Sequence, residues 1–173
     1  MAAWAGWLGL TVLGFCVAAA WWRGRNLAAA PRAVSAAAWA AGAGAVAMTV
    51  SQAISDAIGR ARPFQALHGV VVLVGRPGSF SLPGWEAAFA GAVVAGLWLS
   101  NRNAALVALG AALVLAFSQV YVGVQYPADQ VVGLLIGAVL ALGLRPAGTA
   151  VLRWLAVKVE RSPLHLLVAA HRI

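Results

Sequence analysis

The sequence contains few charged residues. Charged side chains make up 9% of the 173 residues, while hydrophobic residues make up 63%. An ordinary soluble domain has roughly a quarter charged residues and needs a polar surface to stay in solution. Twelve Lys and Arg and four Asp and Glu residues are too few to cover a domain of this size. This scarcity excludes a soluble globular domain and predicts an integral membrane protein.

Cysteine is almost absent, and metal-ligand clusters are missing. The single cysteine, Cys16, lies inside an apolar run, so it can form no internal disulfide and is expected to be inert packing. No grouped His, Cys, Asp or Glu spacing predicts a metal site, and no cofactor is expected. A basic region before the first apolar run is also lacking, which argues against a signal peptide.

The net charge of +8 does not indicate nucleic-acid binding. The basic residues stand singly at the ends of apolar runs instead of forming a stripe on a polar face. Membrane proteins keep their positive charge at these positions. The expected partners are therefore membrane lipids and not nucleic acid, while the oligomeric state stays open.

Apolar runs near the length of a bilayer crossing recur along the chain, and each is bounded by Arg, Pro, Gly or Asn. The fold class predicted is all-α, a polytopic membrane bundle of about five spanning helices in one domain, residues 1–145. The basic tail, 146–173, is expected to begin as an amphipathic helix on the membrane surface. The predicted spans are residues 3–22, 34–58, 86–99, 104–122 and 128–144.

Residues 64–83 differ from these runs because their apolar part is too short to cross a bilayer, which predicts a surface or re-entrant loop. With five spans, nine Lys and Arg residues fall on one side of the membrane and three on the other. The positive-inside rule places the nine in the cytoplasm with the C-terminus. The N-terminus and the loop 64–83 then face the periplasm or the exterior of a bacterial-type plasma membrane.

Three of the four acidic residues, Asp56, Glu86 and Asp129, fall at the outer boundary of three separate segments. Ionisable groups near a membrane are costly and usually face a cavity or one another. This is the candidate site of the sequence. The alternative is that these residues are interfacial anchors and helix caps, and Asp56 and Ser55 fit a cap or a cavity lining equally well.

The order and spacing of these segments resemble the PAP2 phosphatase family, most closely its bacterial undecaprenyl-pyrophosphate phosphatases. That family carries K-x6-R-P, then P-S-G-H, then S-R-x5-H-x3-D. This chain has Arg62-Pro63, then PGWE at 83–86, then SQVYVGVQYPAD at 118–129, and the three skeletons align without gaps. The likeness covers roughly residues 51–144, and its third segment is the most specific.

The resemblance implies a mechanism without metal. One histidine attacks phosphorus and an aspartate orients it, while a second histidine protonates the leaving oxygen. Lys, Arg, Ser and backbone N–H groups bind the phosphate oxygens. Asp129 keeps the orienting position and Arg62 the R-P arginine, with Arg60 as a possible helper.

The chain departs from the pattern at most positions that carry this chemistry. The lysine and arginine positions are Ser55 and Gln119, the P-S-G-H segment has become Pro83, Gly84, Trp85 and Glu86, and the nucleophile position is Gln125. An amide is no nucleophile, so these positions predict a PAP2 scaffold with a disabled site. Glu86 is expected to pair with Arg62 and to fill the anion site from within.

Three functions remain open from the sequence. The first is an impaired homologue that binds a polyprenyl phosphate or a partner membrane protein. The second is an active lipid phosphatase with an altered mechanism, for which His68 is the one histidine of the outer face. The third is a structural membrane protein without a ligand. Gly133 and Gly137 predict close helix packing, within one chain or in a dimer.

Overall fold

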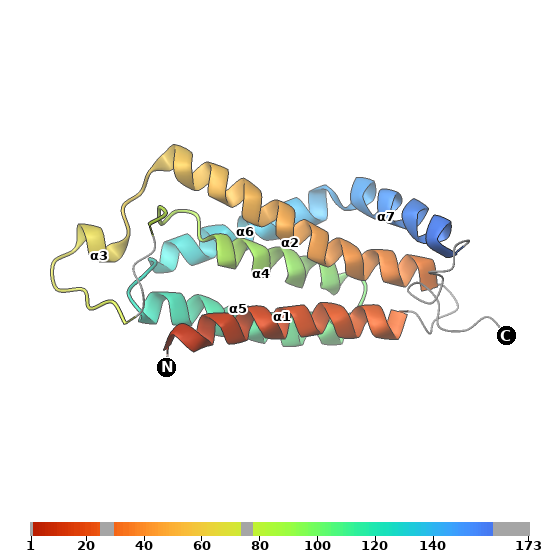
Figure 1. Ribbon diagram of the computed structural model, residues 1–173, viewed down its shortest axis with the longest axis horizontal. Coiled ribbons are helices and arrows are strands. Elements are labelled where there is room, and N and C mark those ends of the chain that lie inside the picture. Colours follow the sequence, from red (N-terminus) through yellow and green to blue (C-terminus); the bar gives the residue numbers. More distant parts are fainter. Residues whose placement is uncertain (1, 25–29, 74–77, 161–173) are drawn as a thin grey trace.

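The computed structural model describes residues 2–24, 30–73 and 78–160 (Figure 1). Two of the basic residues counted for the orientation, Arg25 and Arg76, and the end of the tail, 161–173, lie outside the described residues. Every element of the described part is a helix, which confirms the all-α class. The elements are α1 Ala2–Gly24, α2 Ala30–Ile58, α3 Pro63–Ala66, α4 Trp85–Trp98, α5 Arg102–Tyr121, α6 Pro127–Gly143 and α7 Arg145–Glu160.

Helix α4 is the central element of the bundle. It packs against α2, α5 and α6 and also reaches α1 (Figure 1). Most of its residues are Ala, Gly or Val, and they are buried around the whole helix, so α4 presents no distinct polar face. A helix that is apolar all round is typical of the interior of a membrane bundle.

The contact between α4 and α6 depends on glycine. A Cβ atom on Gly137 would lie 2.8 Å from the backbone nitrogen of Ala92 and closer still to the carbonyl oxygen of Ala88. A Cβ on Gly133 would collide with the carbonyl oxygen of Gly84. Both glycines therefore serve packing within one chain, the first of the two alternatives that the sequence left open.

Helix α7 continues from α6 after a bend of 58°. Its Gly148 lies against the ring of Trp39 on α2, and the indole Nε1 of Trp39 donates a hydrogen bond of 3.0 Å to the carbonyl oxygen of Ala141. Val151 and Trp154 stay exposed. The helical start of the tail is thus as predicted, but one face of α7 packs on α2.

Within the described residues, two helical stretches are long and apolar enough to cross a bilayer, Val34–Ala66 and Arg102–Tyr121. The bent pair of α6 and the first half of α7 adds a third crossing if it counts as one span. The apolar stretches Leu10–Gly24 and Trp85–Trp98 are shorter. These lengths fit a membrane protein, and the five spans stay a prediction.

The described part of the loop 64–83 contains α3 and otherwise irregular backbone. Its Leu73 N–H reaches the carbonyl oxygen of Val122 at 3.5 Å, so the loop lies against the connection between α5 and α6. At this contact Gly123 has φ +73°, where a Cβ would also collide with Val70. The irregular backbone of the described part is as predicted, although α3 was not foreseen, and residues 74–77 lie outside the described residues.

The close contact of α6 with α4 predicts that alanine substitution destabilises the protein at one glycine of α6 but not at another. Gly137→Ala should lower the free energy of unfolding by about 1–3 kcal/mol, because its Cβ meets backbone that cannot move aside. Gly143→Ala is the control, since nothing lies within 4 Å of its Cβ position, and it should stay within about 0.5 kcal/mol of wild type. Denaturation of both purified variants in mixed micelles measures this, and equal losses would contradict the packing.

Candidate functional site

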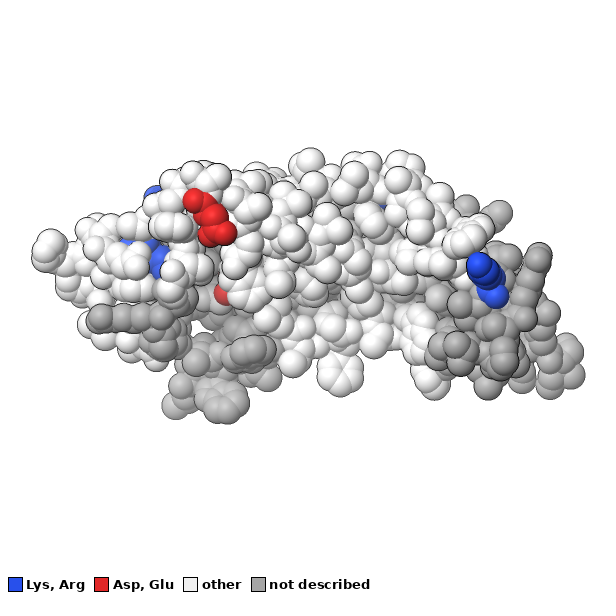
Figure 2. All heavy atoms as spheres, turned by 45° about the horizontal axis from the view of Figure 1, so that its top comes forward, with Lys and Arg blue, Asp and Glu red and all other residues white. Residues whose placement is uncertain are grey.

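The candidate residues of the three segments come together at one end of the bundle. Arg60 and Arg62 follow α2, Glu86 stands in the first turn of α4, and Asp129 stands in the first turn of α6. On the face that Figure 2 shows, the coloured charged side chains lie toward the two ends, with a largely uncharged band between them. Three segments that are separate in the sequence thus meet in one polar cluster.

Asp129 is the most constrained carboxylate of this cluster. It is 0% exposed, and its Oδ1 forms an ion pair of 2.6 Å with Nη1 of Arg60. Its Oδ2 accepts a hydrogen bond from the Ser81 hydroxyl and one of 3.3 Å from the backbone N–H of Tyr126. The carboxylate therefore joins the end of α2, the loop before α4 and the start of α6, where the helix dipole also favours it.

Arg60 has a larger role than the sequence assigned to it. Its guanidinium lies 4.3 Å from the ring centroid of Tyr126 as well as against Asp129. A cation stacked on an aromatic ring and paired with a carboxylate is held in one orientation. The helper position predicted from the sequence is therefore a partner of Asp129.

Arg62 is buried, with 1% of its surface exposed. Its Nε donates to the carbonyl oxygen of Ser79 at 2.7 Å, its Nη2 to the Ser79 hydroxyl at 2.8 Å, and its Nη1 to the carbonyl oxygen of Val124 at 3.2 Å. All three acceptors are neutral. The ring of backbone and hydroxyl acceptors fixes the guanidinium but leaves its charge without a direct counter-charge.

Glu86 makes no direct ion pair with Arg62, although the two side chains lie close enough for their charges to attract each other. Within the part of the chain that the structure describes, the ion pair is between Arg60 and Asp129. The Glu86 carboxylate instead accepts hydrogen bonds of 3.3 Å from Nε2 of Gln119 and from Nε2 of Gln125. Amide side chains reach the carboxylate because they extend from the last turn of α5 and from the α5–α6 connection.

A third amide, that of Gln130, completes this network. Gln125 is 2% exposed, and its Oε1 accepts a hydrogen bond from Nε2 of Gln130. An amide offers both a donor and an acceptor, so Gln125 links Glu86 to Gln130. Gln130 was missed in the sequence because it belongs to none of the three motifs. Its position directly after Asp129 was the one available signal.

Gly84 lies against this amide network, where a side chain would have little room. Its N–H donates to the carbonyl oxygen of Asp129 at 3.1 Å. A Cβ atom at this position would lie 2.6 Å from Oε1 of Gln125 and 3.2 Å from Nε2 of Gln130. A side chain at position 84 therefore requires the Gln125 amide to shift from its observed place beside Gln130.

The remaining predicted residues differ in how deeply they are buried. Ser55 is buried, and its hydroxyl has no hydrogen-bond partner among the described residues, so it lines the interior. Trp85 is half-buried at the first residue of α4, whereas Asp56 and His68 are exposed. No three His, Cys, Asp or Glu side chains of the described part come together in a group that would hold a metal ion.

Comparison with known families gives one match. A sequence model of the family described as PAP2 superfamily matches residues 36–153, from the first turns of α2 to the middle of α7. The comparisons with curated proteins and with solved structures find no match.

The burial of Asp129 predicts an asymmetry within its ion pair. Arg60→Gln should cost about 3 kcal/mol or more of unfolding free energy, because it leaves a buried carboxylate without its cation. Asp129→Asn should cost less, about 2 kcal/mol, because Arg60 is 38% exposed and water can solvate it. Thermal and denaturant unfolding of the purified variants measure the difference.

Asp56→Asn is the matched control for this pair. Its carboxylate is exposed on α2, so the variant should unfold within about 0.5 kcal/mol of wild type. A smaller loss for Arg60→Gln than for Asp129→Asn would show that the carboxylate does not depend on Arg60.

Proposed function

Because the chain belongs to the PAP2 superfamily, we propose that it is a membrane protein that binds a polyprenyl phosphate but does not cleave it through a phosphohistidine. One observation carries this proposal. The position of the nucleophile is Gln125, and both ends of its buried amide are already bound, to Glu86 and to Gln130. The amide has no nucleophilic atom for an attack on phosphorus, and its two hydrogen bonds turn it toward Glu86 and Gln130.

The loss of chemistry extends beyond the nucleophile. Glu86 replaces the acid that would protonate the leaving oxygen, and it accepts two hydrogen bonds as a carboxylate does. Gln119 replaces a cation with a neutral amide that is turned toward Glu86. Removal of one transition-state donor typically costs about 10²–10³ in rate, and residues that act as a unit lose their effect together.

The charge of the cluster favours a ligand of low charge. Arg60 and Arg62 are balanced by Glu86 and Asp129, so the formal charges of these four side chains cancel. Arg62 remains the cation that no carboxylate contacts. A monophosphate carries about −1.5 to −2 at neutral pH, and a pyrophosphate carries more. We therefore favour a polyprenyl monophosphate over a pyrophosphate.

The proposal places the cluster at the outer face of a bacterial-type plasma membrane. If the chain has five spans, the positive-inside count supports an N-terminus outside and a C-terminus in the cytoplasm. The ends of α2, α4, α5 and α6 that carry the cluster then lie at the level of lipid phosphates, and the uncharged band of Figure 2 lies in the hydrocarbon core.

The decisive experiment measures phosphate release from undecaprenyl pyrophosphate by the purified wild-type chain. We expect no turnover above a protein-free control. A combined variant, Gly84→Ser with Glu86→His, Gln119→Arg and Gln125→His, should gain activity by at least about tenfold over background, since it returns the nucleophile, the acid and one cation. Turnover by the wild-type chain that depends on His68 would overturn the proposal.

The order of substitution supplies a control for this experiment. Gly84→Ser alone should destabilise the protein, because its Cβ meets Gln125, by about 1–3 kcal/mol. Gly84→Ser together with Gln125→His should unfold closer to wild type. Equal stability of the single and the double variant would show that positions 84 and 125 are independent.

The proposed orientation predicts which side of the membrane each loop faces. In a Cys16→Ala background, His68→Cys places a thiol in the exposed loop after α3, and Asn103→Cys places one in the exposed first turn of α5. A membrane-impermeant maleimide should label the first in intact cells and the second only after lysis. The reverse pattern would overturn the orientation.

A further inference from the structure

A buried row of residues on α2 changes from apolar to polar toward the end of the bundle that carries the polar cluster. Its members stand four residues apart and all are buried, namely Trp39, Ala43, Ala47, Ser51 and Ser55. Residues four apart lie on one face of a helix. The first three pack with alanines of α4 and α6 in one apolar cluster. Ser51 and Ser55 therefore extend the same face into the seam between α2, α4 and α6.

The two hydroxyls at the end of this row are unpaired. Ser51 is 0% exposed and Ser55 is 1% exposed, and neither Oγ has a hydrogen-bond partner among the described residues. Two other helical hydroxyls donate to a carbonyl oxygen of their own helix, Thr49 at 3.0 Å and Ser118 at 2.7 Å. That bond is open to serine in any helix. Because Ser51 and Ser55 do not make it, their hydroxyls point into the seam.

A third unpaired atom lies on the other side of the seam. Gln130 is 3% exposed, and its Oε1 has no partner in the part of the chain that the structure describes. Helices α2 and α6 run in opposite directions (Figure 1), and Trp39 of α2 donates a hydrogen bond to Ala141 of α6. Ser51 stands twelve residues after Trp39, and Gln130 stands eleven before Ala141. At a rise of 1.5 Å per residue both lie about 16–18 Å from that bond. Ser51 and Gln130 are therefore level with each other, and Ser55 lies one turn further along.

Short side chains surround this level of the bundle. A Cβ atom on Gly84 would lie 3.2 Å from Nε2 of Gln130, so the start of α4 approaches the amide without a side chain between them. Ser81 is 0% exposed, and its N–H donates to the carbonyl oxygen of Arg60 at 3.0 Å. This bond holds the loop before α4 beside the end of α2. The seam at Ser51 is thus closed off from bulk solvent but is lined by small polar residues.

The three unpaired atoms match the hydrogen-bonding groups of water. A serine hydroxyl donates and accepts, and an amide oxygen accepts. A buried water typically makes about two to four hydrogen bonds to polar groups that the protein leaves unpaired. A hydrocarbon chain would leave all three atoms unpaired, and a cation would lack a counter-charge among neutral oxygens. We propose that ordered water binds between Ser51, Ser55 and Gln130, where it joins α2 to α6.

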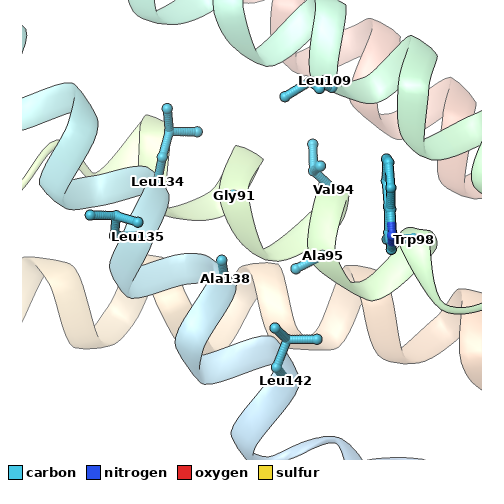
Figure 3. A pocket seen from close by; sticks show the side chains of 9 residues that line it. All are labelled: Gly91, Val94, Ala95, Trp98, Leu109, Leu134, Leu135, Ala138 and Leu142. Carbon is cyan, nitrogen blue, oxygen red and sulfur yellow. The ribbon is translucent and has the colours of Figure 1, made fainter.

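The apolar pocket between α4, α5 and α6 lacks these groups. It has a volume of about 360 Å³, and Figure 3 shows leucines of α5 and α6 around it, with Gly91, Val94 and Trp98 of α4. All of the residues that line it are apolar. Such a lining offers water no partner. Polar atoms, and not volume, therefore locate the water in the seam.

Hydroxyl-radical footprinting of the full-length protein in micelles tests for this water. Radicals that an X-ray pulse forms from bound water oxidise the side chains beside it, even where bulk solvent does not reach. Pro83, next to Gly84, and Leu97 at the far end of α4 are both fully buried, and Leu97 lies in the apolar core. We expect Pro83 to be oxidised at least about tenfold faster than Leu97, because only Pro83 lies near groups that hold water. Equal protection of the two residues would overturn the proposal.

The double variant Ser51→Ala with Ser55→Ala removes two of the three partners of the water. One remaining partner does not hold it, so oxidation of Pro83 should fall by about fivefold or more. Ser118→Ala is the control, since it removes a buried hydroxyl that bonds within its own helix, and it should leave the oxidation of Pro83 unchanged. Unchanged oxidation in the double variant would contradict the assignment.

Thermal unfolding followed by tryptophan fluorescence distinguishes a hydrated hydroxyl from an unpaired one. Ser51→Ala should lower the midpoint by about 2–4 °C, because it removes a hydrogen bond to bound water. Removal of a hydroxyl that has no partner would relieve a desolvation cost, so a higher midpoint would overturn the proposal. Midpoints of the wild-type chain in sodium, potassium and choline chloride of equal ionic strength should agree. Stabilisation by one of these cations that is lost in Ser51→Ala would show that a cation, and not water, occupies the seam.

Discussion

The close approach of α4 and α6 is the constraint on which the rest of the structure depends. Gly133 and Gly137 let the backbone of α6 lie directly against that of α4. In a bilayer, where apolar burial gives little net attraction between helices, such contacts supply much of the packing energy. The same approach sets Gly84 beside Asp129 and Gln125, so the glycine contact also determines the geometry of the polar cluster.

The polar cluster is organised in two parts that meet at α6. Asp129 holds Arg60 and Ser81, while Glu86 holds Gln119 and Gln125. Buried polar groups are costly unless they are paired, and a network with satisfied members stabilises one arrangement of the helix ends. Gln119 and Gln125 thus both contact Glu86, and Gln130 contacts Gln125.

The sequence predicted the helices well and their contacts poorly. The spans 86–99 and 128–144 agree closely with α4 and α6, because Pro127 and the turn residues around Asn101 mark helix ends in any context. The motif order also predicted which segments meet. The Arg60–Asp129 pair and the part played by Gln130 depend on how far each side chain reaches across helix interfaces. For the same reason Glu86 hydrogen-bonds two amides and interacts with Arg62 only at longer range.

The fit between Gly84 and Gln125 has an evolutionary consequence. A serine at 84 collides with the amide at 125, and loss of that amide removes one of the two donors to Glu86. A change at position 84 is therefore tolerated more easily when position 125 changes with it. Exposed residues of the helix surfaces, such as Leu113 of α5, carry no such coupling and can vary singly.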